Sequence, residues 1–549
     1  MKTILGLSAL ALASVPAAGQ TPGVLFRDGD PIVGVGGIER ISYVRVTDSG
    51  MWLSLVEADN SVDNNLDICL MRNGFLTLRE GMNLPQPPGT TLDDWGSIHM
   101  NSRGELGMHL RPRTTTTSDG LYWNLVLVQL KGDVLNLAPF SANARLDGVT
   151  IVRLTEEREL IGLVKVLDTT ISNRAVDALI RYDLGPTGSV LARTTLATKN
   201  VFNDVLGAPI DTLGTVTTPE HSLAVNQLGD FVLPVSGIGA RAIMVNMDRI
   251  VARELEQSPA PGRTWNANAF ALSKVDINDS GDVVYTGTLT PIGGDAGEPT
   301  NFLLVKNDQK IIQSGDVIPA LSPATVGKGS PVVAISNRGD VFWRAQPTST
   351  TAGGAAFMRN LTPLIQESVT TVEGIQVKTV NGSDDAFAIS PEGRFFLGRV
   401  ILQSVTDVDA VIYLDFGLVS ELPGCFGNQG KLLHLSGDAR VGQQLRIGMD
   451  DGPFPGALPI LLFSRNTLLN QAGCGVPTTT GELMLGSPVS NPFFLPAWDG
   501  VNPSVFTVNV PVNMSLVNAK FYVQGLFGNP NQPRSFKLTN GLKYEIGPP

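Results

Sequence analysis

A short pattern of apolar and polar positions recurs between residues 46 and 395 of the chain. An aliphatic residue is followed by Asn, Thr or Ser, then two polar residues, a Gly and a β-rich run. Asn, Asp or Ser suits the start of a tight turn because its side chain accepts a backbone hydrogen bond, and the later Gly suits a left-handed conformation. Each copy therefore predicts the turn of a β-hairpin. The six complete copies have their glycines at Gly50, Gly104, Gly229, Gly281, Gly339 and Gly393.

A seventh, degenerate copy runs from Leu154 to Leu160 and carries Arg158 at the Gly position. With it, the spacings between copies are 54, 54, 71, 52, 58 and 54 residues. A second hairpin lies between copies, as in 303–312 (LLVKNDQKII), so each copy supplies four strands, the content of one propeller blade. Seven copies predict an all-β fold with a seven-bladed β-propeller over residues 20–422; a solenoid of stacked hairpins is the alternative.

Two further features are predicted for the repeated region: how its N-terminal segment pairs, and what fills the long gap between the third and fourth copies. The segment 24–31 looks like an eighth copy of the second hairpin alone, and we expect the mature N-terminus to pair with strands near 411–419, as chain ends do in closed propellers. The spacing of 71 residues predicts a protruding loop over 194–219, because insertions between repeats map to loops.

After residue 422 the period stops, and residues 423–549 contain short β segments separated by Pro and Gly. This spacing predicts a small β-sandwich. Cys425 and Cys474 both lie in this region and each follows a Gly, so we expect a disulfide in an exported chain; two free thiols are the alternative. Cys69 lies in an apolar strand and is expected to be a buried small side chain.

The N-terminus has the pattern of a secretory signal peptide. Lys2 precedes the apolar run 4–15, which is too short to span a bilayer, and small residues stand before a cut between Gly19 and Gln20. A cut after Ala17 is the alternative. Residues 1–19 are therefore the expected signal peptide of a secreted or cell-surface protein, with the periplasm as a further location. No later run approaches 18 apolar residues, so no membrane span is predicted.

Composition narrows the function classes. Apolar residues make up 42% of the chain, which is enough to form buried hydrophobic cores. The net charge of −11 argues against nucleic acid as a partner. The four histidines show no metal-ligand spacing, and neither a nucleophile elbow nor a phosphate loop occurs. The segment 276–282 has alternating oxygen side chains but lacks the twelfth-position Glu of a calcium loop. We therefore predict no catalytic residue, metal or cofactor.

Two sets of side chains are weak candidates for ligand contacts. An acidic residue follows the turn position in five copies, and equivalent positions around a ring could attract a cation; solvated turn charges are the alternative. Two tryptophans between copies could stack on a sugar, with packing against a neighbouring sheet as the alternative. The candidates are Glu105, Asp230, Asp282 and Asp340, with Glu159 in the degenerate copy, and Trp95 and Trp265.

The copies resemble the tandem repeat of secreted bacterial proteins described by the pattern N-x-x-G-x-x-x-F, over about residues 40 to 420. Thr47, Ser336 and Ser390 stand where that pattern has Asn, and the third copy lacks Gly. The last region resembles a C-terminal domain of many exported proteins of environmental bacteria, with its two Gly-Cys pairs and the ending 538–542 (LTNGL). Both resemblances imply an exported protein without an established activity.

Two function classes remain open from the sequence. The first is an exported, non-catalytic binding or surface-associated protein whose partner is an extracellular glycan or protein. The second is a propeller glycosidase or lyase that acts on extracellular polysaccharide. Glycosidases need two carboxyl groups about 5 to 9.5 Å apart. The scarce histidines and missing motifs favour the first class.

Overall fold

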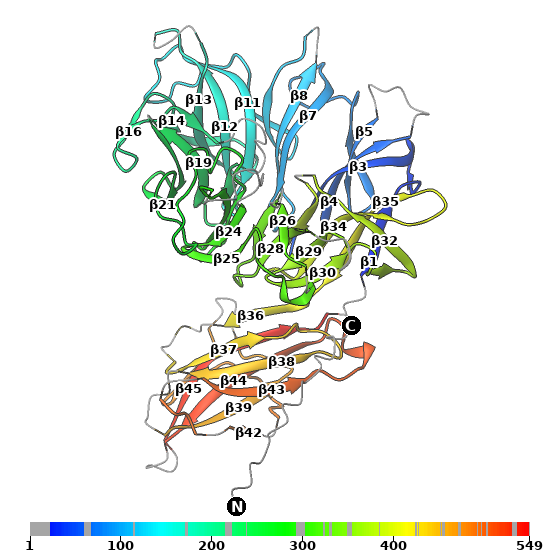
Figure 1. Cartoon of the computed structure of the whole chain (residues 1–549), viewed down its shortest axis with the longest axis vertical. Helices are drawn as coiled ribbons and strands as arrows, with labels where there is room; N and C mark the ends of the chain where they lie inside the picture. Colours follow the sequence, from blue (N-terminus) through cyan, green and yellow to red (C-terminus); the bar gives the residue numbers. More distant parts are fainter. Residues whose placement is uncertain are drawn as a thin grey trace, which may run out of the picture. The chain divides into compact units, whose positions relative to one another are not determined.

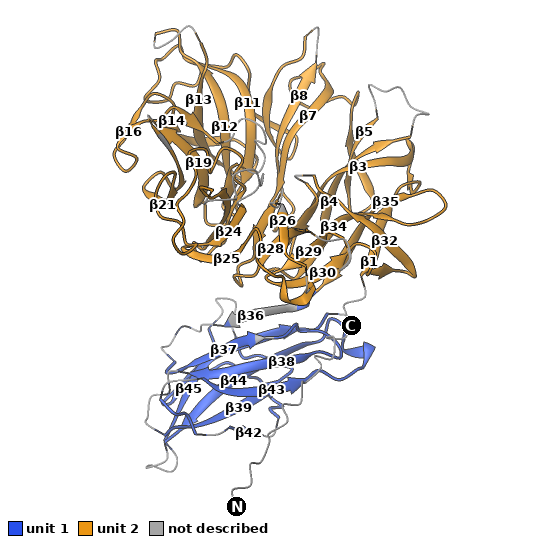
Figure 2. Ribbon diagram, viewed as in Figure 1, with its two compact units in different colours: residues 1–21, 416–549 blue, residues 22–415 orange. Residues whose placement is uncertain are grey.

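The computed structural model divides the chain into two compact units, Pro22–Asp415 and Phe416–Pro549 (Figure 2). The described residues of both units are mostly β-strands and connecting turns, with short 3-10 helices at Pro319–Leu321 and Met514–Leu516. No helix in the part of the chain that is described is long and apolar enough to cross a membrane. The expected signal peptide, with its cut between Gly19 and Gln20, lies outside the described residues. The structure describes residues 22–59, 67–113, 116–170, 174–214, 222–237, 239–291, 302–321, 324–328, 332–348, 354–383, 385–422, 425, 428–450, 452, 456–469, 474–490, 492–495, 497–500, 503–529 and 535–547.

The described residues of Pro22–Asp415 form seven antiparallel sheets of four to six strands, numbered here as sheets 1 to 7 in chain order (Figure 1). Sheet 1 contains β2 (Pro31–Ile32), β3 (Gly36–Val46), β4 (Trp52–Ala58), β5 (Ile68–Arg72) and β6 (Phe75–Arg79). Sheet 2 contains β7 (Thr91–Met100), β8 (Leu106–Arg113), β9 (Gly120–Trp123) and β10 (Val126–Leu130). Sheet 3 contains β11 (Arg145–Leu154), β12 (Glu159–Leu167), β13 (Val176–Leu184) and β14 (Val190–Thr198).

The remaining sheets of this unit repeat the same plan. Sheet 4 contains β17 (Thr212–Leu213), β18 (Ala224–Val225), β19 (Phe231–Gly237), β20 (Ala240–Val245) and β21 (Arg249–Arg253). Sheet 5 contains β22 (Val275–Ile277), β23 (Val283–Thr288), β24 (Phe302–Lys306) and β25 (Gln309–Gln313). Sheet 6 contains β26 (Val326–Lys328), β27 (Val333–Ile335), β28 (Val341–Pro347), β29 (Ala356–Arg359) and β30 (Thr362–Gln366). Sheet 7 contains β31 (Thr371–Val372), β32 (Ile375–Val380), β33 (Phe387–Ile389), β34 (Phe395–Leu402), β35 (Val408–Asp415) and the N-terminal β1 (Gly23–Arg27).

Apolar cores join each sheet to the next. Five buried clusters lie between sheets 1 and 2, 2 and 3, 3 and 4, 4 and 5, and 5 and 6. Sheets 6 and 7 meet through aromatic rings, with the centroids of Phe357 and Phe387 5.5 Å apart. A further cluster packs Val411 of sheet 7 against Ile41 and Val44 of sheet 1. The succession of sheets therefore closes on itself.

The N-terminal strand completes the last sheet. β1 pairs with β35 through Gly23 opposite Tyr413, Val24 opposite Ile412 and Phe26 opposite Val411. The expected pairing near residue 411 is confirmed for residues 24–27, whereas Pro31 belongs to β2 and pairs with β3 of sheet 1. The chain ends of this unit are thus held in one sheet, which stabilises the closure between its first and last parts.

The long gap between the third and fourth copies is not a protruding loop in its described part. Thr194 belongs to β14, and the chain then forms a short hairpin of β15 (Phe202–Asn203) and β16 (Ala208–Pro209). Leu206, Ile210 and Leu213 are buried in the core shared by sheets 3 and 4. The expected protruding loop was wrong. The buried apolar residues of this segment follow neither a strand nor a helix period, so the sequence pattern did not reveal that they are buried. Residues 215–221 lie outside the described chain.

The second unit has its own core between two sheets. One contains β36 (Leu418–Leu422), β45 (Phe536–Glu545), β44 (Lys520–Gly528), β39 (Leu458–Ser464) and β42 (Phe493–Phe494), and the other β37 (Lys431–Ser436), β38 (Gln444–Asp450) and β43 (Ser504–Asn509); β40 (Val476–Thr478) pairs with β41 (Gly481–Leu483). Leu432 and Ile447 of the smaller sheet share the core with Val523 and Leu542 of the larger. Because β36 pairs with β45, this unit begins before the expected boundary at residue 423.

A disulfide joins Cys425 to Cys474 in the second unit, as expected, with the two Cα atoms 5.2 Å apart. Glu482 is fully buried beside it, and its carboxylate accepts hydrogen bonds from the backbone N–H groups of Cys425 and Gly475. Cys69 is a buried free thiol in β5, and burial raises its pKa to about 11. The thiol is therefore protonated and unreactive at neutral pH.

We expect replacement of both bridged cysteines by Ser to lower the free energy of unfolding of the C-terminal unit by about 2 to 4 kcal/mol. The bridge closes a loop with a sequence separation of 49, and opening it restores conformational entropy to the unfolded chain. Chemical denaturation of the two forms measures the difference. Cys69→Ser is the control for thiol removal, and its effect should be confined to the other unit.

Candidate functional site

The seven predicted turns share one backbone geometry. All six motif glycines have positive φ angles, between 68° and 94°, and Arg158 of the degenerate copy has a φ of 62°. In each turn the N–H of this residue donates to the carbonyl three residues earlier, as Gly281 does to Asn278 at 3.0 Å. The assignment of Arg158 to the Gly position is therefore structurally correct.

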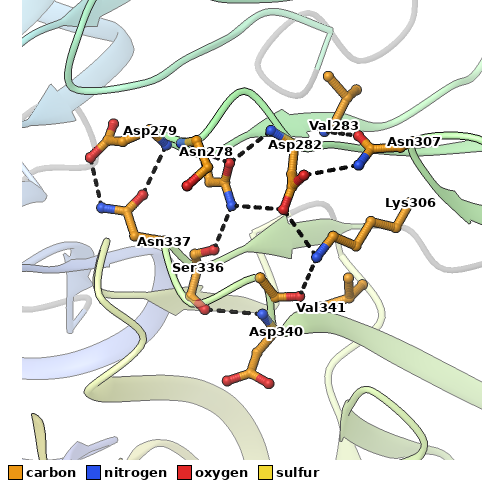
Figure 3. Close-up of polar contacts among 12 residues, drawn as sticks. Asn278, Asp279, Asp282, Val283, Lys306, Asn307, Ser336, Asn337, Asp340 and Val341 are labelled. Carbon is orange, nitrogen blue, oxygen red and sulfur yellow. Dashed lines mark hydrogen bonds and ion pairs between the residues drawn. The ribbon is translucent and has the colours of Figure 1, made fainter. Parts of the chain in front are cut away.

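The first polar side chain of each turn closes it from inside. Asn278 Oδ1 accepts from the N–H of Asp282 at 2.8 Å, and Ser336 Oγ accepts from the N–H of Asp340 at 3.2 Å (Figure 3). An amide and a hydroxyl both supply the required acceptor, which explains why Thr and Ser replace Asn. The same role belongs to Thr47, Asn101, Thr155 and Asn226, whereas Ser390 accepts from the N–H of Phe395, one residue farther along the chain.

Where the motif residue is Asn, its side chain makes a second hydrogen bond that is not seen for Thr or Ser at the same position in the described turns. Its Nδ2 donates to a backbone carbonyl of the next turn: Asn101 to Thr155 at 3.2 Å, Asn226 to Asn278 at 3.0 Å, and Asn278 to Ser336 at 3.0 Å. These partners are 52 to 58 residues apart in sequence. The motif residue thus links sheets as well as forming its own turn.

In five turns the next residue extends this link around the ring of sheets, and in the turn of sheet 7 Glu392 does so, because Pro391 has no N–H. The N–H of this residue donates to the side chain or carbonyl of the following turn, as Asp279 donates to Asn337 Oδ1 at 2.9 Å. The last link runs from the N–H of Glu392 to both oxygens of Asp48, at 3.0 and 3.1 Å, and joins sheet 7 to sheet 1. The other links are Ser102 to Glu156, Glu156 to Gln227, Gln227 to Asp279, and Asn337 to Pro391.

The acidic residues of the predicted cation face are each bound by another side chain, within their own sheet in four cases and across to the next sheet for Glu105. Asp282 accepts from Asn307 Nδ2 at 2.9 Å and pairs with Lys306 at 3.1 Å (Figure 3). Burial opposes ionisation, but these bonds hold the pKa of Asp282 below its ordinary value. The described residues bring no three His, Cys, Asp or Glu side chains together as metal ligands. Comparable contacts hold Glu105 to Arg158, Glu159 to Arg181, Asp230 to Asn246, and Asp340 to Arg359.

The two candidate tryptophans lie in hydrophobic cores. Trp265 is 1% exposed and packs against the rings of Phe270 and Tyr285, and Trp95 is 8% exposed in the core between sheets 1 and 2. Neither side chain offers a face on which a sugar could stack. The sequence could not separate the two alternatives because both place an aromatic residue between copies.

A cavity of about 190 Å³ lies where the first strands of the sheets reach their turns. The residue two positions before the turn, immediately preceding the aliphatic residue of the motif, lines this cavity in all seven copies. The seven residues, which define the axial cavity, are Arg45, His99, Arg153, Ala224, Asp276, Ala334 and Ala388.

The four polar residues of the axial cavity are anchored to the backbone. Arg153 donates through Nε to the carbonyl of Leu223 at 3.0 Å, and His99 Nδ1 accepts from the N–H of Leu154 at 3.2 Å. Asp276 Oδ2 accepts from the N–H of Ile335 at 2.8 Å. Arg45 lies over the Tyr43 ring, with its guanidinium carbon 4.2 Å from the ring centroid. Each side chain is thus held in place around the cavity.

These groups influence one another's ionisation. Burial raises the pKa of Asp276 to about 6, although Arg153 and Arg45 act in the opposite direction. Burial, together with the same two arginines, lowers the pKa of His99 well below its ordinary value. At neutral pH the seven equivalent positions therefore carry two guanidinium cations, one carboxylate and a neutral imidazole, and Glu156 and Asp279 add two further carboxyl groups to the cavity wall.

Sequence reasoning did not identify this site, although a signal was present. Aligned copies read Arg, His, Arg, Ala, Asp, Ala and Ala at one position of an otherwise apolar strand end. The turn residues and the acidic residue after them carry the more regular pattern in the sequence, but their side chains are bound within and between the turns. The residue before the aliphatic residue of each motif lines a common cavity only because the seven sheets close into a ring.

No protein-family model matches the chain, and no curated protein matches it. Among solved structures, it is similar to a Trypanosoma rangeli sialidase in complex with the inhibitor DANA, at 10% identity over 96% of each chain with a TM-score of 0.30. An aldose sugar dehydrogenase from Streptomyces coelicolor matches 61% of this chain and 95% of its own, at 10% identity and a TM-score of 0.23. Such low TM-scores carry no argument about function.

We expect Asn278→Ala to lower the free energy of unfolding of the unit Pro22–Asp415 by about 2 to 4 kcal/mol. The change removes an acceptor and a donor at a side chain that is 3% exposed, and buried backbone groups lose their partners. Asn278→Ser should cost about half as much, because the hydroxyl keeps the acceptor. Ser280→Ala, at an exposed position of the same turn, is the control; an Asn278→Ala cost below 0.5 kcal/mol, within the roughly ±0.5 kcal/mol of ordinary surface changes, would contradict the assignment.

We expect the stability of the protein relative to an Asp276→Asn variant to fall as pH rises from about 4 to about 6. The folded-state pKa of Asp276, about 6, lies above the unfolded value near 3.9, so the folded state holds an extra proton in this window. Ionisation then costs about 1 to 3 kcal/mol, with no further change above pH 7. Denaturation at pH 4, 5, 6 and 7 tests this; a difference independent of pH would refute it.

Proposed function

We propose that this chain is an exported, non-catalytic binding protein in which a seven-bladed β-propeller takes a small ligand into its axial cavity. The C-terminal unit is a β-sandwich appended to the propeller. The observation that carries the proposal is the set of four polar side chains at one equivalent position around a single cavity.

The closed succession of sheets supports the propeller. Each sheet packs on the next, sheet 7 packs on sheet 1, and six successive links between turns follow the same order. A ring of blades is the arrangement in which equivalent turns meet around one axis. The tandem copies with their near-constant spacing support the same count of blades.

The composition of the cavity wall supports binding. Three sheets place Ala at this position and still form the same turn, so the fold does not require a polar residue there. Burying a charged side chain is unfavourable unless it gains compensating interactions. Three charged side chains, Arg45, Arg153 and Asp276, together with the neutral His99 around one space therefore favour a ligand over stability alone.

The same geometry favours binding over hydrolysis of polysaccharide. Asp276 is the ionisable carboxyl group at the equivalent position, and its oxygens accept backbone hydrogen bonds from Ile277 and Ile335. Glu156 and Asp279 also line the cavity, and they accept bonds from Ser102 and Gln227. These carboxylates anchor the backbone, whereas a glycosidase needs an acid and a base directed at the bond it cleaves.

Export rests on the N-terminal signal pattern and on the disulfide. Bonded cysteines are typical of oxidising compartments outside the cytosol. Secretion or display at the cell surface, with the N-terminus cut before Gln20, is consistent with both. The resemblance to exported tandem-repeat proteins points the same way.

We expect Ala334→Phe to abolish ligand binding by filling the axial cavity from a sheet that contributes no charged group there. The probe is a panel of monosaccharides, sugar acids, amino acids and short carboxylates, and a binding member raises the melting temperature of the folded protein. Ala334→Ser keeps the cavity open and is the matched control. If the same probes stabilise the Phe variant equally, the ligand does not occupy the axial cavity.

A further inference from the structure

The wall of the axial cavity carries an unpaired hydrogen-bond donor on His99. Leu154 donates its backbone N–H to His99 Nδ1 at 3.2 Å, so Nδ1 is the unprotonated nitrogen and the proton of the neutral ring lies on Nε2. Among the described residues this Nε2–H has no acceptor, and His99 lines the cavity. We propose that the ligand of the axial cavity is a neutral polyhydroxyl compound of monosaccharide size that accepts a hydrogen bond from His99 Nε2–H. This inference rests on the proposed function and deepens it.

Asp276 supplies the complementary acceptor. Its two carboxylate oxygens each accept one backbone N–H, from Ile277 at 3.0 Å and from Ile335 at 2.8 Å. A carboxylate offers about four lone-pair sites, so each oxygen keeps the capacity for one more hydrogen bond. A hydroxyl group can donate to such an oxygen and can also accept from an N–H such as that of His99. A ligand with several hydroxyl groups therefore matches both kinds of group.

The charges of the cavity wall compensate one another. Arg45 and Arg153 bring two positive charges, and both guanidinium groups also donate to backbone carbonyls and have further interactions within the protein. Asp276, Glu156 and Asp279 bring up to three negative charges. An anion would thus enter a wall without excess positive charge, and a desolvated charge that lacks a counter-charge is costly. The wall therefore favours a ligand without net charge.

The carboxylates of the turns are occupied by donors of the protein itself. Glu156 accepts from the N–H of Ser102 at 2.6 Å. Asp279 accepts from the N–H of Gln227 at 2.8 Å and from Asn337 Nδ2 at 2.6 Å. The asparagine amides of the turns likewise donate to carbonyls of neighbouring turns. An ammonium ligand would have to compete with these donors, so the excess of carboxylates does not favour a cation either.

The axial cavity has a polar part and an apolar part, as a sugar ring has. Sheets 1, 2 and 3 supply Arg45, His99 and Arg153, whereas sheets 6 and 7 supply Ala334 and Ala388. A sugar carries hydroxyl groups at its rim and C–H groups on its faces, so it can bond to the first part and pack on the second. The cavity of about 190 Å³ is smaller than the roughly 300 to 1,000 Å³ of pockets for drug-sized ligands, which restricts the ligand to a single ring.

Calorimetry on the chain from residue 20 tests the charge of the ligand. The neutral probes are glucose, galactose and mannose, and the charged analogues are glucuronate, galacturonate, glucosamine and galactosamine. We expect at least one neutral probe to bind and charged analogues to bind roughly tenfold more weakly or not at all, because the wall offers no unused counter-charge. The Kd of the neutral probe should change less than about twofold between about 0.05 M and about 0.5 M salt, because it has no charge to screen.

The variant His99→Asn tests the donor. The amide oxygen of Asn can accept the N–H of Leu154 as Nδ1 does, but the shorter side chain places no donor at the position of Nε2. We expect the variant to bind the neutral probe about threefold to tenfold more weakly, the size of one neutral hydrogen bond. His434→Asn, the same change in the second unit, is the matched control and should leave the Kd unchanged.

The outcomes separate this inference from the proposed function. A neutral probe that binds most tightly, loses affinity in His99→Asn and fails to bind Ala334→Phe supports the inference. A charged analogue that binds more tightly than its neutral parent, or a neutral probe whose affinity is unchanged in folded His99→Asn, overturns it and leaves the proposed function intact. The lack of any binding sensitive to Ala334→Phe overturns both. Because the comparison of charged and neutral probes uses the unaltered chain, it decides the inference even where His99→Asn does not fold.

Discussion

The hydrogen bonds between successive turns, from sheet 2 through sheet 7 and back to sheet 1, are the constraint on which the first unit depends. Apolar cores between sheets are strong but weakly directional, so they do not fix how far one sheet slides along another. A backbone N–H at the buried end of a strand must find an acceptor, and here the following turn supplies it, as Asn337 does for Asp279. The bond from Glu392 to Asp48 applies the same rule across the closure. Register and closure are therefore set by the same contacts.

This constraint also creates the candidate site. Once the turns are linked, the residues just before them converge on one cavity, whatever their chemistry. A polar residue at this position in one sheet acts on polar residues of sheets far away in sequence: Arg45 and Arg153 influence the ionisation of Asp276, in sheet 5. The ring thus converts a single position of a repeated segment into the wall of one shared cavity, while the residue type at that position differs between sheets.

Local features could be predicted from the sequence, and contacts between copies could not. The turn at Gly281, the disulfide and the pairing of the N-terminal strand follow from residue types, spacing and the position of the chain ends. The second bond of Asn278 reaches a partner 58 residues away, and one motif alone does not reveal it. Asp282 was considered as a cation ligand because its partners, Asn307 and Lys306, lie on another hairpin. The axial residues were missed because only ring closure brings them together.

The degenerate third turn shows that the ring, and not the individual motif, determines this geometry. Arg158 adopts a left-handed conformation, which costs a residue with a side chain about 1 to 2 kcal/mol relative to glycine. Its side chain bonds Glu105 Oε1 of the previous turn at 2.8 Å and lies over the Trp123 ring, 5.9 Å from the centroid. Contacts with the neighbouring sheet offset the local strain. A copy can therefore lose its glycine and keep its turn, provided that its neighbours on both sides hold it.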